Sequence, residues 1–128
     1  MASPSVFVAN DDPAFVELIA ELLLDAGYPK TVWHIGQGAF HRIRDEQPTL
    51  VLLDINLANP GRGWNTLDAL RLHPKTRHIP VILCSTDMRL LNEKADLLRE
   101  LHCQTLEKPF DLETLLDQVA AAIGSPPS

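Results

Sequence analysis

Residues 50–56 read LVLLDIN: four apolar residues, then Asp54, then one more aliphatic residue. A short continuous apolar run is typical of a strand in a parallel sheet that helices cover on both faces. A charged side chain directly after such a strand needs a physical reason, because burying a charge is costly. We therefore expect Asp54 to have a chemical role at the end of this strand.

Outward from this stretch, short apolar runs alternate with segments of helical spacing. The predicted strands are residues 6–9, 31–34, 50–53, 79–85 and 105–107, and the predicted helices are about 13–26, 37–46, 66–72, 90–101 and 112–123. Five strands alternating with five helices predict an α/β domain with a parallel sheet. The first helix has the clearest ends, since Asp12 can cap it, Pro13 suits its first turn and Gly27 can close it.

Composition restricts the class of protein. The 128 residues suffice for one domain, and 45% hydrophobic with 22% charged residues is ordinary for a globular chain. A net charge of −6 argues against a nucleic-acid surface, which needs clustered Lys and Arg. Without a secretory leader or a membrane-length apolar run, we expect a cytoplasmic protein with no membrane contact. Cys84 and Cys103 lack zinc-finger or CxxC spacing and are expected to be reduced thiols.

Ligands of open parallel sheets bind at the carboxyl ends of the strands. Polar residues stand at four of these ends: Asn10 and Asp11, Asp54, Ser85, and Lys108. Two neighbouring carboxylates must share a proton or hold a cation, and few oxygen ligands open to water suit Mg²⁺. Lys108 and Ser85 suit the anionic oxygens of a phosphoryl group. A carboxylate nucleophile beside Mg²⁺, opposite a lysine and a hydroxyl, is suited to forming an aspartyl-phosphate.

The order of motifs gives a more specific indication. NDDP, LVLLDINL, PGRGW, IPVILCST and LEKPF occur in this order between about Ser5 and Ile123. Together they resemble the receiver domain of bacterial two-component response regulators. The resemblance implies a flavodoxin-like (βα)5 fold, with a doubly wound five-stranded parallel sheet. It also implies a single receiver domain over residues 1–128, with a core at about 5–123 and a flexible tail at 124–128.

The resemblance assigns roles to the residues that carry phosphoryl chemistry. Asp54 matches the phosphorylated aspartate, Ser85 the switch hydroxyl, and Lys108 the lysine that contacts the phosphoryl group. The Lys108–Pro109 bond matches a peptide bond that is usually cis in the family, a form that only X-Pro bonds adopt readily.

The implied metal is Mg²⁺. Its expected ligands are the carboxylates of Asp11 and Asp54 and the backbone carbonyl of Asn56, with Asn10 acting through water. Asn10 departs from the family, which usually has Asp or Glu there, so we expect weaker but not abolished metal affinity.

Two further departures concern the surface that reports phosphorylation. Thr105 stands where a switching Tyr or Phe is usual, so the aromatic part of the usual switch is missing. Leu101 and His102 occupy a turn where glycine is common, which predicts a locally different loop.

We therefore interpret the chain as a phosphoacceptor signalling domain, not an enzyme beyond self-phosphorylation and self-dephosphorylation. Its expected partners are a histidine kinase or phosphotransfer protein and an unknown downstream protein, and its expected state is a monomer or weak homodimer. It could be a single-domain regulator or the receiver of a longer protein. One alternative is a receiver-like interaction module independent of phosphate, motivated by Asn10 and Thr105. Another is a small aspartyl-nucleophile phosphatase, for which Asn56 leaves no general acid.

Overall fold

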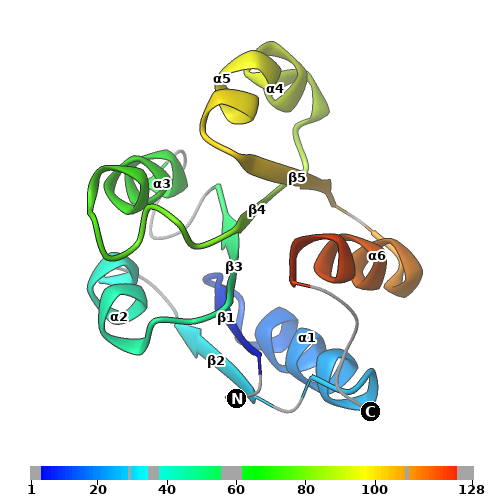
Figure 1. Ribbon diagram of the computed structural model, residues 1–128. Coiled ribbons are helices and arrows are strands. Elements are labelled where there is room, and N and C mark those ends of the chain that lie inside the picture. The colour runs from blue at the N-terminus through cyan, green and yellow to red at the C-terminus, as the bar shows by residue number, and fades with distance from the viewer. Residues whose placement is uncertain (1–3, 29, 35–37, 56–61, 109, 124–128) are drawn as a thin grey trace.

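The computed structural model describes residues 4–28, 30–34, 38–55, 62–108 and 110–123. Its five strands are β1 (Ser5–Ala9), β2 (Lys30–His34), β3 (Leu50–Asp54), β4 (Val81–Ser85) and β5 (Cys103–Glu107). They form one parallel sheet in the order β2-β1-β3-β4-β5, so β1 and β3 lie side by side at its centre (Figure 1). The predicted parallel α/β architecture is therefore confirmed. The expected tail at 124–128 lies outside the described residues.

Helices cover both faces of the sheet (Figure 1). Their bounds are α1 (Pro13–Asp25), α2 (Ala39–Glu46), α3 (Arg62–Leu72), α4 (Met88–Glu93), α5 (Ala95–Glu100) and α6 (Leu112–Ile123). Alternate residues of the strands pack into two separate cores. One core lies against α1 and α6, and the other against α2, α3, α4 and α5. None of the helices in the described ranges is long and apolar enough to cross a membrane.

The ends of α1 follow the sequence prediction. The Asp12 side chain accepts a hydrogen bond from the N–H of Ala14 at 3.1 Å, and Pro13 occupies the first helical position. Gly27 adopts a left-handed φ of 101°, and the N–H of Tyr28 then donates back to a helix carbonyl at 2.8 Å. The polar cap and the glycine therefore fix where the chain turns into and out of this helix.

The segment after β4 differs from the prediction. A single helix over 90–101 was expected, but α4 and α5 are separate six-residue helices that meet at Lys94. Lys94 has φ −99° and ψ 9°, outside the helical range, so the helix breaks there without proline or glycine. The described part of the chain thus contains six helices, one more than predicted.

Several predicted boundaries were also wrong. The predicted helix at 66–72 begins earlier, at Arg62. Its first turn was not predicted, because Gly63 in that turn is more typical of a loop. The helix expected from 37 begins at Ala39, after Gly38 in a left-handed conformation. β4 begins at Val81, two residues later than expected, and follows Pro80, which has no backbone N–H to donate. β5 begins at Cys103, two residues earlier than expected. The apolar pattern did not show this start, because β5 is an edge strand and includes polar residues such as Gln104.

Candidate functional site

Asp54 and Lys108 meet at the carboxyl edge of the sheet. Strand alternation places Asp54, the last residue of β3, on the same face as Leu52, which packs toward α1 and α6. Lys108 follows the end of β5, and its Nζ lies 3.0 Å from Asp54 Oδ2. The two side chains are only 18% and 15% exposed, so this ion pair is largely removed from water. The structure therefore joins two predicted site residues that are 54 positions apart in sequence.

Two contacts fix the position of Lys108. Its backbone N–H donates to the carbonyl of Ser85 at 2.8 Å, which ties the start of the loop after β5 to the end of β4. Its Nζ also lies 4.7 Å from the centre of the Phe15 ring, within the range of a cation–π contact. Helical spacing of the apolar residues predicts only that Phe15 lies on the apolar face of a helix. Its place in the first turn of α1, directly after NDDP at a strand end, is the signal that could have identified it.

Ser85 ends β4 and is buried, with 2% of its surface exposed. Asp54 pairs in register with Cys84, so Ser85 stands one position beyond the partner of the proposed phosphoacceptor. Its Oγ accepts a hydrogen bond from the N–H of Asp87 at 3.0 Å. Asp87 in turn caps α4 by accepting from the N–H of Leu90 at 3.0 Å. A short chain of contacts therefore runs from the Ser85 hydroxyl to the start of α4.

The polar residues after β1 lie at the same edge. Ala9 pairs in register with Leu53, so Asn10 and Asp11 follow β1 beside Asp54. Asn10 is buried, with 4% exposed, and its Oδ1 accepts from the N–H of Asp12 at 2.9 Å. The amide oxygen retains a second lone pair after making this bond. Asp11 is exposed to solvent.

These oxygen donors fit Mg²⁺. A hard cation such as Mg²⁺ binds carboxylate, carbonyl and water oxygens, and it keeps several of its waters. Asp11 is exposed to solvent, so a cation bound there could keep those waters. Within the described ranges no group of three or more His, Cys, Asp or Glu could hold a metal, because the third acidic position is the amide of Asn10. The expected carbonyl ligand Asn56 and the expected cis bond to Pro109 lie outside the described residues, so both stay predictions.

The turn after Asp54 packs closely against α3. The N–H of Gly63 donates to the Ile55 carbonyl at 2.7 Å. A Cβ added to Gly63 would lie 2.6 Å from Ile55 Cα, which real side chains do not approach. The motif PGRGW gave a signal for this role, because a glycine such as Gly63 allows two backbone segments to approach closely.

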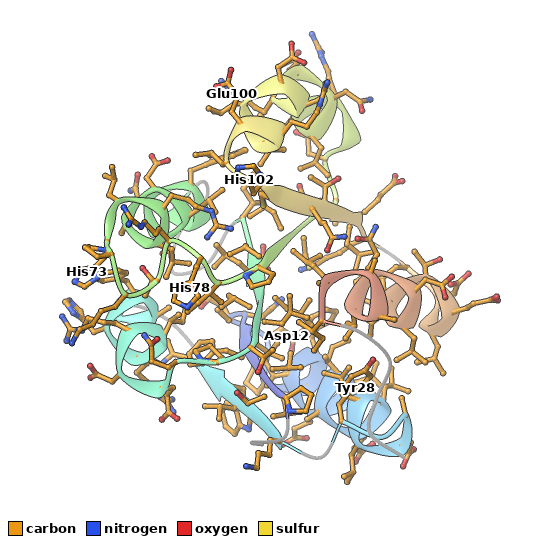
Figure 2. All side chains as sticks on the ribbon, viewed as in Figure 1. Asp12, Tyr28, His73, His78, Glu100 and His102 are labelled. Carbon is orange, nitrogen blue, oxygen red and sulfur yellow. The ribbon has the colours of Figure 1, made fainter. Side chains whose placement is uncertain are left out.

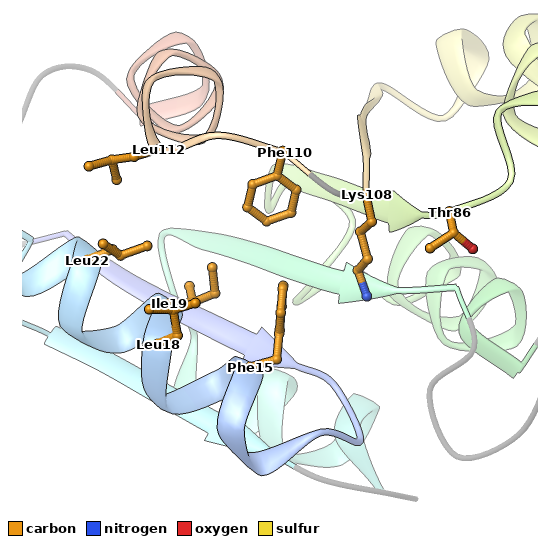
Figure 3. Close-up of a pocket in the computed structure, with 8 residues that line it drawn as sticks. All are labelled: Phe15, Leu18, Ile19, Leu22, Thr86, Lys108, Phe110 and Leu112. Atoms are coloured by element: carbon orange, nitrogen blue, oxygen red, sulfur yellow. The ribbon is translucent and has the colours of Figure 1, made fainter.

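A groove of about 420 Å³ adjoins the ion pair, between α1 and the start of α6 (Figure 3). Its lining is mostly apolar and consists of Phe15, Leu18, Ile19, Leu22, Thr86, Lys108, Phe110 and Leu112. Figure 3 shows Lys108 reaching past Phe15 at the end of the groove nearest the strand ends.

The two cysteine thiols are held in their protonated form. Burial raises the pKa of Cys84, which lies beside Asp54 in the sheet, to about 12. Burial also raises the pKa of Cys103 to about 11. Both thiols therefore stay protonated at neutral pH.

Comparison with known proteins agrees with this arrangement. The family model for the response regulator receiver domain matches residues 6–120. The chain is 29% identical over 126 residues to the DNA-binding dual master transcriptional regulator RpaA of Synechocystis sp., covering 94% of this chain and 49% of that protein. It is 25% identical over 121 residues to the polar-differentiation response regulator DivK of Brucella ovis, covering 94% and 96%. The chain thus spans half or less of the length of RpaA and of other longer relatives that it matches, but nearly all of DivK.

Solved structures share the fold. The chemotaxis response regulator CheY4 of Vibrio cholerae superposes with a TM-score of 0.81 at 21% identity, covering 94% of this chain and 99% of that one. The phosphorylated cyanobacterial phytochrome response regulator RcpA gives a TM-score of 0.68 at 26% identity, covering 94% and 91%. Since the family model extends from the first strand into the last helix, the chain belongs to the response regulator receiver domains of two-component signalling.

Proposed function

We propose that this domain accepts a phosphoryl group on Asp54 from a histidine kinase or phosphotransfer protein, in a reaction that depends on Mg²⁺. The observation that carries the proposal is the contact of Asp54 Oδ2 with Lys108 Nζ at 3.0 Å, on the sheet edge where ligands of this fold bind. RcpA, a similar response regulator, has been solved in a phosphorylated form, which supports the same chemistry here.

The chemistry follows from the side chains present. A carboxylate oxygen of Asp54 would attack the phosphorus of a phosphohistidine and form a new O–P bond, giving an acyl phosphate. The P–N bond would break, and the imidazole would leave with the electron pair. The Lys108 ammonium, which already contacts Asp54, would then bind the negatively charged phosphoryl oxygens.

The expected metal would act at the same edge. Asp11, Asp54 and the carbonyl of Asn56 would hold Mg²⁺, with Asn10 contributing through water. When bound, Mg²⁺ would offset negative charge on the phosphoryl oxygens.

Ser85 would carry the signal outward. A phosphoryl oxygen that binds the Ser85 hydroxyl would compete with its present bond to the N–H of Asp87. Because Asp87 caps α4, releasing that bond would change the start of this helix. We expect the change to concentrate around residues 85–87, since Thr105 offers no aromatic ring to extend it along β5.

The test is to incubate the protein with Mg²⁺ and acetyl phosphate and to locate the adduct. Intact mass spectrometry should show one added phosphoryl group, and peptide mapping after reduction of the acyl phosphate should place it on Asp54. An adduct on another aspartate, or none under conditions that phosphorylate a known receiver, would contradict the proposal.

A second candidate is an interaction module that works without phosphate. The observation in its favour is Asn10, a buried amide at a usual acidic position, whose oxygen already binds the N–H of Asp12. Mg²⁺ titration followed by amide NMR shifts separates the two candidates. A phosphoacceptor should bind Mg²⁺, and Asn10→Asp should tighten it by about 1 kcal/mol, the scale of one charge-assisted contact. Absence of Mg²⁺ binding in both proteins would favour the interaction module.

A further inference from the structure

The Phe15 ring lies against the Lys108 ammonium. Lys108 Nζ is 4.7 Å from the ring centre, while the same nitrogen lies 3.0 Å from Asp54 Oδ2. The ammonium thus contacts both a carboxylate and an aromatic ring. Figure 3 shows the Phe15 side chain extending from α1 and the Lys108 side chain extending beside it from the end of β5.

The ring itself is held by a second aromatic residue. Phe110 packs edge-on against Phe15, with ring centres 6.0 Å apart and planes at 81°. Phe110 comes from the loop before α6 and also lines the groove (Figure 3). An edge-to-face pair restricts ring rotation, so the face of Phe15 keeps its orientation toward Lys108.

The choice of an aromatic partner has a chemical consequence. Only 18% of the Lys108 side chain is exposed, so its ammonium has lost part of its water shell. A second carboxylate would offset that loss but would compete with the phosphoryl group for the lysine. A ring face attracts the cation more weakly and leaves its N–H donors available to anionic oxygens.

We propose that Phe15 is a positioning residue for phosphoryl transfer, whose ring face holds the Lys108 ammonium at Asp54 and allows it to move onto the phosphoryl oxygens. This inference rests on the proposed role of Asp54 as phosphoacceptor. It predicts that the electrostatic character of the ring, and not merely its volume, sets the rate of phosphorylation.

The test replaces Phe15 with mono-, di- and trifluorophenylalanine, which withdraw electron density from the ring face while nearly preserving its shape. The phosphorylation rate with acetyl phosphate and Mg²⁺ should fall stepwise along the series. Phe15→Leu, which removes the ring, should be about three-fold slower than wild type, as expected for one partly exposed cation–π contact. Phe15→Tyr, which retains the ring, should keep the wild-type rate.

The matched control is the same series at Phe40, which packs against His73 on the other face of the sheet. It should leave the rate unchanged. A flat rate along the Phe15 series, or a loss that tracks the unfolding midpoint, would overturn the proposal.

A second readout does not require phosphorylation. Hydrogen exchange of the Lys108 ammonium, followed by NMR in the unmodified protein, should quicken along the Phe15 series as the lysine is held less firmly. Faster exchange in a protein that acetyl phosphate does not modify would mean that Asp54 is not the acceptor, although the ring holds the lysine. Unchanged exchange would exclude the ring contact itself.

Discussion

The phosphoacceptor edge and the surface formed by residues 88–107 are built differently. At the edge, Asp54, Lys108 and Ser85 come from three separate strand ends and are all largely buried. In the surface of residues 88–107, called here the α4–α5–β5 surface, the buried residues among the described side chains of α4 and α5 are Leu91 and Leu98. Two ion pairs within the described part of these helices, Arg89–Glu93 and Arg99–Asp96, are exposed and contribute little to stability.

A single arginine from outside the α4–α5–β5 surface helps to hold it. Arg71 of α3 donates from Nε to the Leu101 carbonyl at 2.6 Å and from Nη1 to the Ile79 carbonyl at 2.8 Å. Burial lowers the pKa of this guanidinium, because its charged form loses water. His102 lies in the turn before β5, where Arg71 donates to the Leu101 carbonyl (Figure 2). The edge thus depends on paired strands. The helices α4 and α5 instead depend on few buried contacts and should rearrange at lower free-energy cost.

The largest expected effect is loss of function at the edge. Asp54→Asn should abolish phosphorylation, because an amide oxygen is too weak a nucleophile to accept the phosphoryl group. The free energy of unfolding should change by no more than about 1 kcal/mol, since the amide still accepts from Lys108 and repulsion by Asp11 disappears. Phosphate incorporation and urea unfolding measure the two effects.

Asp12→Asn is the matched control for this variant. Asp12 caps α1, and asparagine caps helices equally well, so both phosphorylation and stability should be retained. Phosphate incorporation into Asp54→Asn, or its loss in Asp12→Asn, would show that the acceptor has been assigned to the wrong aspartate.

Packing behind the edge should give the next largest effect. Gly63→Ala places a methyl group 2.6 Å from Ile55 Cα, so backbone must shift, and we expect a net loss of about 2 kcal/mol. At Gly38 the nearest atom would be 3.8 Å away, and only its φ of 89° opposes a side chain. Gly38→Ala should therefore cost about 1 kcal/mol. Urea unfolding compares the two, and an equal or smaller loss at Gly63 would mean that α3 can move away from β3.

The same contrast explains how much the sequence could predict. Residues 50–54 and the α1 caps at Asp12 and Gly27 are local signals that tertiary packing reinforces, so these predictions were correct. The break at Lys94 has no local signal, because lysine is an ordinary helix former. The contact of Phe15 with Lys108 joins elements far apart in sequence, and periodicity identifies only the side of the helix on which Phe15 lies.

A pH-dependent effect should come from the two thiols, one in each region. Their pKa values in the folded protein are about 12 for Cys84 and about 11 for Cys103, against about 8.5 for an unfolded chain. Above about pH 8.5 the unfolded state releases these protons while the folded state keeps them, so stability falls as pH rises. Each thiol should contribute up to about 1.4 kcal/mol per pH unit until the pH reaches its folded value.

Urea unfolding between about pH 9 and about pH 10.5 measures this slope. Cys103→Ala and Cys84→Ala should each reduce the slope of unfolding free energy against pH. A cavity left by either substitution should lower that free energy by almost the same amount at all pH values. A slope that neither variant changes would show that the folded protein accommodates the thiolates.

The smallest effect concerns the turn before β5. His102 has a left-handed φ of 53°, which costs about 1 kcal/mol for a residue with a Cβ. Its carbonyl meets Arg71 Nη2 at 3.5 Å, a contact that any residue could provide, so the imidazole is not needed for it. His102→Gly should therefore raise the free energy of unfolding by up to about 1 kcal/mol, less the added entropy of a more flexible unfolded chain.

Gln47 provides the comparison, because it ends α2 with a similar φ of 50°. Its side chain donates to the carbonyls of Arg44 at 2.8 Å and Lys75 at 3.0 Å, so Gln47→Gly removes two hydrogen bonds while relieving the same strain. We expect Gln47→Gly to be neutral or destabilising in urea unfolding, whereas His102→Gly stabilises. If His102→Gly destabilises instead, the imidazole itself supports the α4–α5–β5 surface, and that surface is held more firmly than its few buried residues indicate.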